Sequence, residues 1–248
     1  MRVAVAGSTG NIGTHTVAAL ERGGHEVVGI SRSLGIDLTT GEGLDEALAG
    51  VDAVVDATNA PPMDAEATVA HFRRITSTLL EAERRAGVRH HVLLSIVGIA
   101  KVPGNAHYAG KREQERLVEA GPVPWTIVPA TQFHDFAEMV AGWTENDGVA
   151  RIAPLLVQPI DPADVGAILA EVAVGEPQGR YADVAGPETH DLVDMARRSL
   201  AARGREVRLE PTWDGIFGEE MAGSVLLPGE RVRIAPTRFD EWLARQAS

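Results

Sequence analysis

The chain has 248 residues, of which 44% are hydrophobic and 23% are charged, the composition of an ordinary globular domain with one sizeable core. Its formal net charge of −12 argues against nucleic acid as a partner, because phosphate backbones require clustered lysine and arginine. With no cysteine, it has no disulfide, thiolate nucleophile or cysteine-based metal centre. Apolar runs such as 92–100 reach about half the length that crosses a bilayer, so we expect no membrane contact.

Strands alternate with helices through the first half of the chain. Hydrophobic periodicity predicts strands at about 2–6, 26–31, 52–57, 90–96 and 124–129, and helices at about 11–22, 41–49, 64–87 and 107–120. The strands are nearly continuous apolar runs, as expected when both faces of a sheet are buried. This order predicts an α/β fold, a Rossmann-type doubly wound parallel sheet with helices on both faces.

A glycine-rich turn follows the first strand and opens the first helix. It reads Gly7-Ser8-Thr9-Gly10-Asn11-Ile12-Gly13. In this context the spacing is typical of dinucleotide binding: Gly7 allows a tight turn, Gly10 the close approach of a pyrophosphate, and Gly13 the close packing of helix on strand. The helix N-terminus supplies N–H donors and a positive dipole. The residues expected to present backbone groups to the phosphates are Thr9, Asn11 and Ile12. The alternative is a glycine turn without a ligand.

The end of the second strand bears on the choice of dinucleotide. An acidic residue there binds the ribose 2′-hydroxyl of NAD, whereas an arginine accommodates the 2′-phosphate of NADP. No carboxylate stands at this strand end, and Ser31, Arg32 and Ser33 supply donors for a phosphate dianion. We therefore favour NADP(H). In the alternative, Arg32 is an ordinary exposed charge and Asp37 binds the ribose of NAD(H).

After Pro129 the alternation of strands and helices loosens. We expect helices at about 132–144, 162–174 and 188–203, and short strands near 180–184 and 206–210. The sequence predicts a single Rossmann-type domain over residues 1–248. Its dinucleotide-binding core spans about 1–135, and a small C-terminal substrate-covering region spans about 136–248.

Four segments together resemble the atypical short-chain dehydrogenase/reductases, and among them the NmrA-like, NAD(P)H-binding subgroup, which is related to quinone reductases of that type. The segments are residues 7–13, 56–60, 91–95 and 124–133. The resemblance covers most of the chain, and the family spacing Gly-x-x-Gly-x-x-Gly is met in full.

The resemblance implies further cofactor contacts at the carboxyl ends of the strands, where open parallel sheets place their ligands. Along the ribose it implies Ala57, Thr58 and Asn59, and beside the nicotinamide Pro129, Ala130 and Thr131. It also implies that Ser95 lies at the catalytic edge and contacts the cofactor. A serine at a strand end is equally a common turn or helix cap.

The catalytic element of the family is Tyr-x-x-x-Lys, whose side chains lie one helical turn apart, so that the ammonium lowers the pKa of the phenol. This chain departs from that pattern, because His107 stands four residues before Lys111 and Tyr108 three residues before it. In one interpretation, Lys111 holds the nicotinamide ribose while Tyr108 or His107 delivers a proton. In a second, hydride passes to a quinone with no donor beyond water or His107. In a third, the cofactor binds without chemistry.

Three further histidines stand at or after predicted strands. His90 and His91 begin a strand and face opposite ways, so they are expected to be structural. Phe133 and His134 follow the strand at 124–129, on the side where a substrate would enter, and are predicted to line the substrate pocket. His134 has no companion ligand at suitable spacing, so we expect no metal.

The sequence thus predicts an NAD(P)-dependent oxidoreductase that transfers hydride from NADPH to a small carbonyl or quinone. The alternative is a non-catalytic, NmrA-like regulatory protein that senses NAD(P). The first strand begins near residue 2 and leaves no room for a signal peptide, so we expect a cytoplasmic protein. Its expected partner is a small-molecule substrate, and we expect a monomer or homodimer.

Overall fold

The computed structural model describes residues 1–61 and 63–246. They form two compact units, each built from two stretches of the chain. The first unit holds residues 1–129 and 165–182, and the second holds residues 130–164 and the chain from 183 onward. The chain leaves the first unit after Pro129, and residues 165–182 return to it, which local sequence patterns do not reveal.

The first unit is built on a sheet of parallel strands. Its strands are β1 (Arg2–Ala6), β2 (Glu26–Ile30), β3 (Ala53–Asp56), β4 (His90–Ile96), β5 (Trp125–Ala130) and β9 (Gly179–Arg180). The last residue of β5, Ala130, is already assigned to the second unit. The five longer strands lie in the order β5-β4-β3-β1-β2, and β9 pairs with β5. β1 pairs in parallel with both β2 and β3, and β3 pairs in parallel with β4. The strand order therefore reverses beside β1, and ligands of open α/β sheets bind outside the carboxyl ends of strands at such a point.

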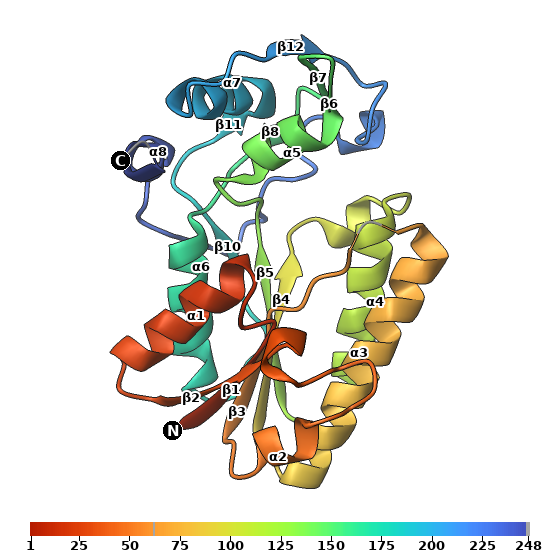
Figure 1. Ribbon diagram of the computed structural model, residues 1–248, viewed down its shortest axis with the longest axis vertical. Helices are drawn as coiled ribbons and strands as arrows, with labels where there is room; N and C mark the ends of the chain where they lie inside the picture. The colour runs from red at the N-terminus through yellow and green to blue at the C-terminus, as the bar shows by residue number, and fades with distance from the viewer. Residues whose placement is uncertain (62, 247–248) are drawn as a thin grey trace. The chain divides into compact units, whose positions relative to one another are not determined.

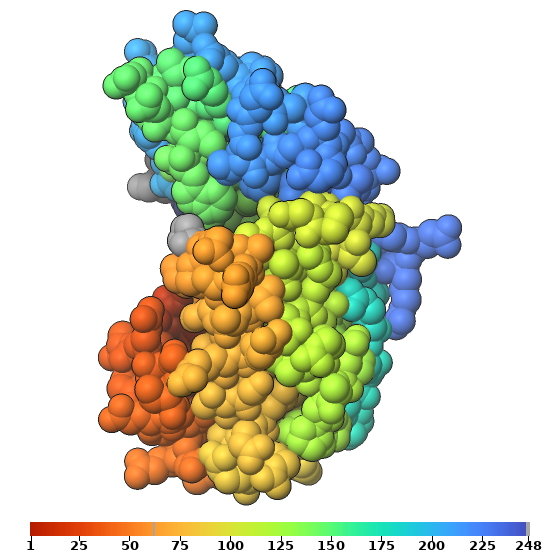
Figure 2. Space-filling view, turned by 90° about the vertical axis from the view of Figure 1, so that its right-hand side faces the viewer, coloured from red at the N-terminus to blue at the C-terminus, as the bar shows by residue number. Residues whose placement is uncertain are grey.

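Helices cover both faces of this sheet. They are α1 (Asn11–Arg22), α2 (Leu44–Leu48), α3 (Ala65–Ala86), α4 (Ala106–Ala120) and most of α6 (Pro162–Ala173), with 3₁₀ turns at Arg32–Leu34 and Ile99–Lys101. α1 and α6 lie on one face, and α3 and α4 on the other (Figure 1). Figure 2 shows α3 and α4 packed side by side. The predicted α/β, doubly wound Rossmann fold is confirmed.

Helix α3 shows how the sequence sets these elements. The Asp64 side chain caps its start by accepting a 2.8 Å hydrogen bond from the Ala67 N–H. Gly87 ends it in the left-handed region at φ 74°, where glycine is not strained. Phe72 and Leu79, two turns apart, are fully buried against the unit's core. Its charged residues at 81, 84 and 85 form exposed ion pairs, as expected for a solvated face.

The described part of the second unit combines short strands with helices. The helices are α5 (Phe136–Thr144), α7 (Leu192–Ala202) and α8 (Phe239–Gln246), with a 3₁₀ turn at Glu219–Met221. The strands are β6 (Glu145–Asn146), β7 (Val149–Ile152), β8 (Leu156–Val157), β10 (Asp183–Ala185), β11 (His190–Asp191), β12 (Arg208–Pro211) and β13 (Val232–Ile234). β12, β7 and β6 form one sheet and β11 pairs with β8, while β10 pairs in parallel with β13 and, through Val184, with Ala130.

Two helices of the second unit begin later than expected because other structure uses the preceding backbone. α5 starts at Phe136 and not near 132, since the Thr131 and His134 N–H groups donate to carbonyls of distant segments. α7 starts at Leu192 and not near 188, since His190 and Asp191 pair with β8. The Asp191 side chain then caps α7. None of the helices in the described ranges is both long and apolar enough to cross a membrane.

Candidate cofactor and catalytic site

The glycine turn has the geometry that a dinucleotide-binding turn requires. Gly7 lies in the left-handed region at φ +78°, and a Cβ there would stand 2.8 Å from the Ala57 carbonyl oxygen. A Cβ on Gly13 would stand 2.0 Å from the Gly7 oxygen. The first helix can pack this closely on the turn only where residue 13 has no side chain. The conformational roles predicted for Gly7 and Gly13 are confirmed.

The turn also presents backbone groups at the start of α1. Gly10 is the N-cap of this 12-residue helix, and it has extended backbone and no side chain to occupy the first-turn N–H groups. A Cβ on Gly10 would stand 3.2 Å from the Gly7 oxygen, so the cradle is tight there too. The chemistry of this donor set fits a diphosphate, because a helix N-terminus offers N–H donors and a partial positive charge.

The end of β2 holds the residues expected to discriminate between dinucleotides. Ser31 directly precedes the 3₁₀ turn that starts at Arg32, and the Ser31 and Ser33 hydroxyls lie 2.9 Å apart. The Arg32 side chain is exposed. Asp37 instead closes a local turn, because its carboxylate accepts a 2.7 Å hydrogen bond from the Thr39 N–H. This bond, together with the nearby Arg32 charge, holds the pKa of Asp37 below its usual value.

The predicted ribose-binding segment lies directly beside the glycine turn. The Ala57 carbonyl is close to Gly7, as its distance from a Cβ at that position shows. Thr58 turns back on Asp56, with its N–H and hydroxyl donating to one carboxylate oxygen at 2.9 and 2.5 Å. The Asn59 side chain accepts from the Ala60 N–H at 2.9 Å. The structure thus brings two of the predicted cofactor-binding segments of the first unit together, residues 7–13 and 57–59.

Lys111 is buried on α4 and belongs to a chain of side-chain hydrogen bonds. Its Nζ donates to the Gln114 Oε1, and the Gln114 Nε2 donates to the Asp56 Oδ2 at 2.8 Å. All three side chains are almost fully shielded from solvent. Burial lowers the pKa of Lys111 to about 8, although the Asp56 and Glu115 carboxylates oppose this effect. The ammonium is therefore held at the carboxyl end of β3.

Phe72, on α3, packs against two of the candidate acid–base groups on α4. Its ring lies 5.3 Å from the Lys111 Nζ and meets the His107 ring edge-on at 5.9 Å between centroids. Burial and the Lys111 charge lower the pKa of His107 to about 4. Tyr108, the neighbouring candidate, is also buried. The four-residue spacing does place His107 and Lys111 on one side of α4.

Ser95, predicted for the catalytic edge, is engaged with another acidic residue. Its hydroxyl donates to the Glu115 Oε1 at 2.5 Å, and the Glu115 Oε2 pairs with Arg180 at 3.0 Å. Ser95 and Glu115 are buried. The structure shows a serine occupied by a carboxylate, and a catalytic role for Ser95 stays a prediction.

The remaining predicted residues are divided between the units. Pro129 ends the first stretch of the first unit, and Ala130 begins the second. In the second unit the Thr131 hydroxyl donates to the Gln158 carbonyl at 2.6 Å. His134 is buried against the rings of Phe239 and Trp242, and its Nε2 lies 3.1 Å from the Pro159 carbonyl oxygen. The Phe133 backbone pairs with Ile160. Cofactor contact by Thr131 and substrate contact by Phe133 and His134 stay predictions.

Sequence reasoning missed the residues that connect the site. Asp56, Gln114, Glu115 and Arg180 were not predicted as functional, yet they surround Lys111 and Ser95. The three-residue spacing between Lys111 and Gln114 on one helix was a usable signal. The bond from Gln114 to Asp56 had no such signal, because the sequence of a helix does not tell which strand end the helix faces.

The two strand-initial histidines behave as predicted. His90 lies within hydrogen-bonding distance of the Gly175 carbonyl and the Thr126 hydroxyl, whereas His91 contacts Glu83 of α3 at 2.9 Å, so the two side chains face opposite ways. Burial raises the pKa of Glu83, although His91 opposes this effect. Burial alone would lower the pKa of His91, but the Glu83 carboxylate outweighs it and raises that pKa.

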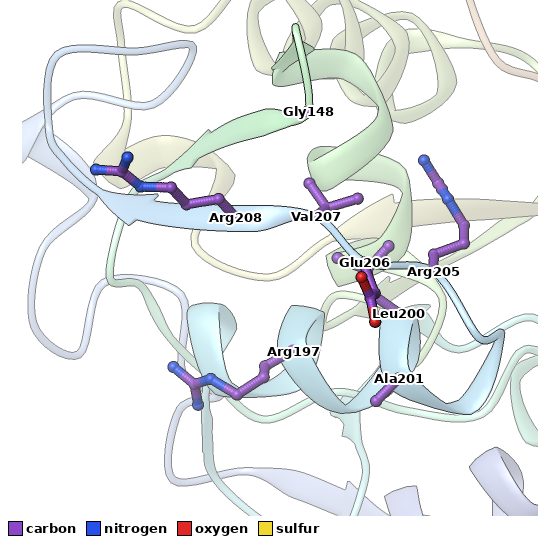
Figure 3. Close-up of a pocket in the computed structure, with 8 residues that line it drawn as sticks. All are labelled: Gly148, Arg197, Leu200, Ala201, Arg205, Glu206, Val207 and Arg208. Atoms are coloured by element: carbon purple, nitrogen blue, oxygen red, sulfur yellow. The ribbon is translucent and has the colours of Figure 1, made fainter.

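A surface groove in the second unit lies outside every predicted site. Figure 3 shows the groove, which is lined by Gly148, Arg197, Leu200, Ala201, Arg205, Glu206, Val207 and Arg208. Each of its arginines already pairs with a carboxylate, Arg197 with Asp194, Arg205 with Glu145 and Arg208 with Glu210. We therefore assign it no anionic ligand. Within the described ranges, no group of three acidic or histidine side chains is arranged to hold a metal ion.

The fold and the glycine turn together define a dinucleotide-binding protein of the Rossmann type. Residues 7–174 match the family described as NAD(P)H-binding. The match covers more than half of the chain, so the chain belongs to the NAD(P)H-binding family, and the family resemblance read from its motifs is confirmed. A comparison with curated proteins gives no match.

Solved structures support the same fold. An NADPH-dependent quinone oxidoreductase from Escherichia coli is 15% identical, with 99% of this chain and 100% of that chain covered and a TM-score of 0.70. A short-chain dehydrogenase/reductase superfamily protein from Agrobacterium tumefaciens with bound NAD is 20% identical, with 100% and 96% covered and a TM-score of 0.70. The Citrobacter sp. triphenylmethane reductase complexed with NADP(H) is 16% identical, with 86% and 79% covered and a TM-score of 0.62. At these identities the likeness shows the fold.

Proposed function

We propose that the protein is an oxidoreductase that transfers hydride from NADPH to a small carbonyl or quinone acceptor. The observation that carries the proposal is the buried Lys111, held through Gln114 to Asp56 at the end of β3, in the same unit as the glycine turn. Burying an ammonium costs desolvation free energy that only hydrogen-bond or charged partners offset. Buried titratable groups of this kind concentrate at functional sites. Lys111 is suited to hold the hydroxyls of the nicotinamide ribose.

Arg32 supports NADPH as the dinucleotide. It stands at the end of β2 beside two serine hydroxyls, where a guanidinium can hold a 2′-phosphate through charge-assisted hydrogen bonds. The competing carboxylate, Asp37, accepts from the Thr39 backbone in a local turn. Replacing Arg32 with alanine should weaken NADPH binding about 10- to 100-fold and NADH binding little, which calorimetry can measure. Equal losses for both dinucleotides would remove Arg32 from the site.

The nicotinamide ring supplies the hydride when the cofactor is bound. The proton that completes the reduction must come from another group. At neutral pH the His107 imidazole carries no charge, because its pKa lies near 4, so imidazolium is not available as an acid. Tyr108 or water is the better donor, and an acceptor that is easily reduced, such as a quinone, depends least on a positioned acid. The quinone oxidoreductase of the same fold supports this choice of acceptor.

One observation favours a second candidate function. The position four residues before Lys111 holds an uncharged histidine where the family's catalytic tyrosine would stand. A site that binds NAD(P) but lacks this acid suits a regulatory protein of the NmrA kind, which senses the dinucleotide without turnover. The two functions differ in whether the bound cofactor is consumed.

The test is a reaction followed by the absorbance of reduced nicotinamide. The wild-type protein is mixed with NADPH and then with a panel of quinones and aldehydes. We expect acceptor-dependent oxidation of NADPH, strongest with quinones, and a loss of about 100-fold or more in the Lys111→Ala variant. Lys101→Ala, which alters the other, exposed lysine, is the matched control and should retain activity. Tight NADPH binding with no oxidation across the panel would favour the sensor.

A further inference from the structure

Lysine is rare in this chain, and one of its two lysines is buried. Of 23 basic residues only Lys101 and Lys111 are lysines. Lys101 is exposed, whereas Lys111 is 4% exposed. Arginine is the residue that proteins use for fixed charges, while a buried lysine can change its protonation state. The surroundings of Lys111 therefore decide whether it carries a charge.

The Lys111 ammonium reaches the nearest buried carboxylate only through an amide. Its Nζ donates one hydrogen bond, to the Gln114 Oε1, and donates no second one within residues 1–61 and 63–246. The Gln114 Nε2 donates to the Asp56 Oδ2 at 2.8 Å, while the other carboxylate oxygen accepts from Thr58. An ammonium only donates and a carboxylate only accepts, so the amide can be held in one orientation alone. Glutamine is the side chain that satisfies both neighbours at once.

The other charged groups near Lys111 have partners of their own. Glu115, on the same helix, is bonded to Ser95 and to Arg180. On β4, His91 is paired with Glu83 of α3, and it feels the Lys111 charge only at a distance. His107 on α4 also faces the ammonium and is uncharged at neutral pH. The packed part of α3 offers Phe72, an uncharged ring. Asp56, through Gln114, is the carboxylate that remains to balance Lys111.

We propose that Gln114 is a positioning residue, whose side-chain amide links the Asp56 carboxylate to Lys111 and so fixes the place and the charge of the ammonium that holds the cofactor ribose. This inference rests on the role of Lys111 in the proposed function. The link keeps the carboxylate one amide away from the ammonium. The amide oxygen accepts from one of the three N–H groups of the ammonium, so the remaining N–H groups are left for the ribose hydroxyls.

Two isosteric variants change the charge around Lys111 in opposite directions. Gln114→Glu places a carboxylate against the ammonium and should raise the pKa of Lys111 by about one pH unit or more. Asp56→Asn keeps an oxygen that can accept from Gln114, but it removes the negative charge and should lower that pKa by about one pH unit. If positions 114 and 56 were too far from the Lys111 Nζ to act on its charge, neither change would move the pKa of Lys111.

Because the chain has two lysines, the experiment can be read directly. Protein grown with lysine labelled at Cε with ¹³C gives two NMR signals, which are followed from pH 6 to pH 11 without cofactor. We expect the Lys111 signal to titrate near pH 8 in the wild type, higher in Gln114→Glu and lower in Asp56→Asn. The Lys101 signal is the internal reference and should not move between variants. An unchanged Lys111 titration in both folded variants would overturn the proposal.

A second readout ties the link to cofactor binding. The affinity of the wild type for NADPH should fall as pH rises through about 8, because the ammonium is lost. This fall should shift to higher pH in Gln114→Glu and to lower pH in Asp56→Asn. If the wild type does not bind NADPH at all, the proposed function fails while the NMR titration still tests the link. If it binds with the same pH profile in all three proteins, the link fails and the function stands.

Discussion

The two units differ in how their buried polar side chains are hydrogen-bonded. Near the strand ends of the first unit these side chains bond mainly to one another, whereas in the second unit they bond mainly to backbone carbonyls. Lys111, Gln114 and Asp56 form one chain of side-chain bonds in the first unit. In the second, Thr131 donates to the Gln158 carbonyl and His134 contacts the Pro159 carbonyl. Side-chain networks hold charges whose state can change, whereas bonds to carbonyls fix the path of the chain. The first unit thus holds buried charges in a side-chain network, whereas the second uses buried side chains to fix irregular segments.

The comparison predicts that breaking a buried ion pair in the first unit has the largest effect on stability. Glu83→Ala leaves His91 buried beside a void and should cost about 3–5 kcal/mol of the unfolding free energy, measured by urea denaturation. The control is Glu81→Ala on the same helix, which breaks an exposed pair with Arg84 and should change the unfolding free energy little. Similar losses in the two variants would mean that burial of the pair carries no weight.

Glycine substitutions should have opposite signs in the two units. Gly13→Ala forces a Cβ to within 2.0 Å of the Gly7 oxygen and should lower the free energy of unfolding by about 3 kcal/mol. It should also weaken NADPH binding. Gly142→Ala in α5 meets no atom within 4 Å and should stabilise the protein by about 0.5–1 kcal/mol. Thermal unfolding of both variants compares them. A Gly13→Ala protein as stable as the wild type would show that the turn is not tightly packed.

A smaller effect distinguishes the second unit at acid pH. Burial lowers the pKa of His134 to about 4, so its contribution to stability is complete above pH 6.5 and is lost as pH falls toward 4. Between pH 7 and pH 5 this loss should reach about 2 kcal/mol, and His107 adds a loss of the same sign. His134→Leu should remove the His134 part of this loss and keep the parts due to His107 and to His90 and His190, whose pKa values burial also lowers. An identical acid profile in wild type and variant would contradict the burial of a neutral His134.

The sequence was most informative where structure is local. The alternation of apolar strands and helices predicted the order of elements up to Pro129, and Gly7 and Gly13 predicted the turn because their spacing encodes backbone geometry. In the second unit, His190 and Asp191 pair with a strand more than thirty residues earlier, so no local pattern predicts where α7 begins. Within the site, Lys111 was predicted from the resemblance to the family's Tyr-x-x-x-Lys element. The link from Lys111 through Gln114 to Asp56 was not predicted, because Lys111 and Asp56 are 55 residues apart in the sequence.

The central claim, that the first unit binds NADPH, is tested most directly by calorimetric titration of the wild-type protein with NADPH and with NADH. The glycine cradle and Arg32 predict that both dinucleotides bind and that NADPH binds about tenfold or more tightly, a difference of about 1.4 kcal/mol. Binding of neither dinucleotide at millimolar concentration would contradict the account.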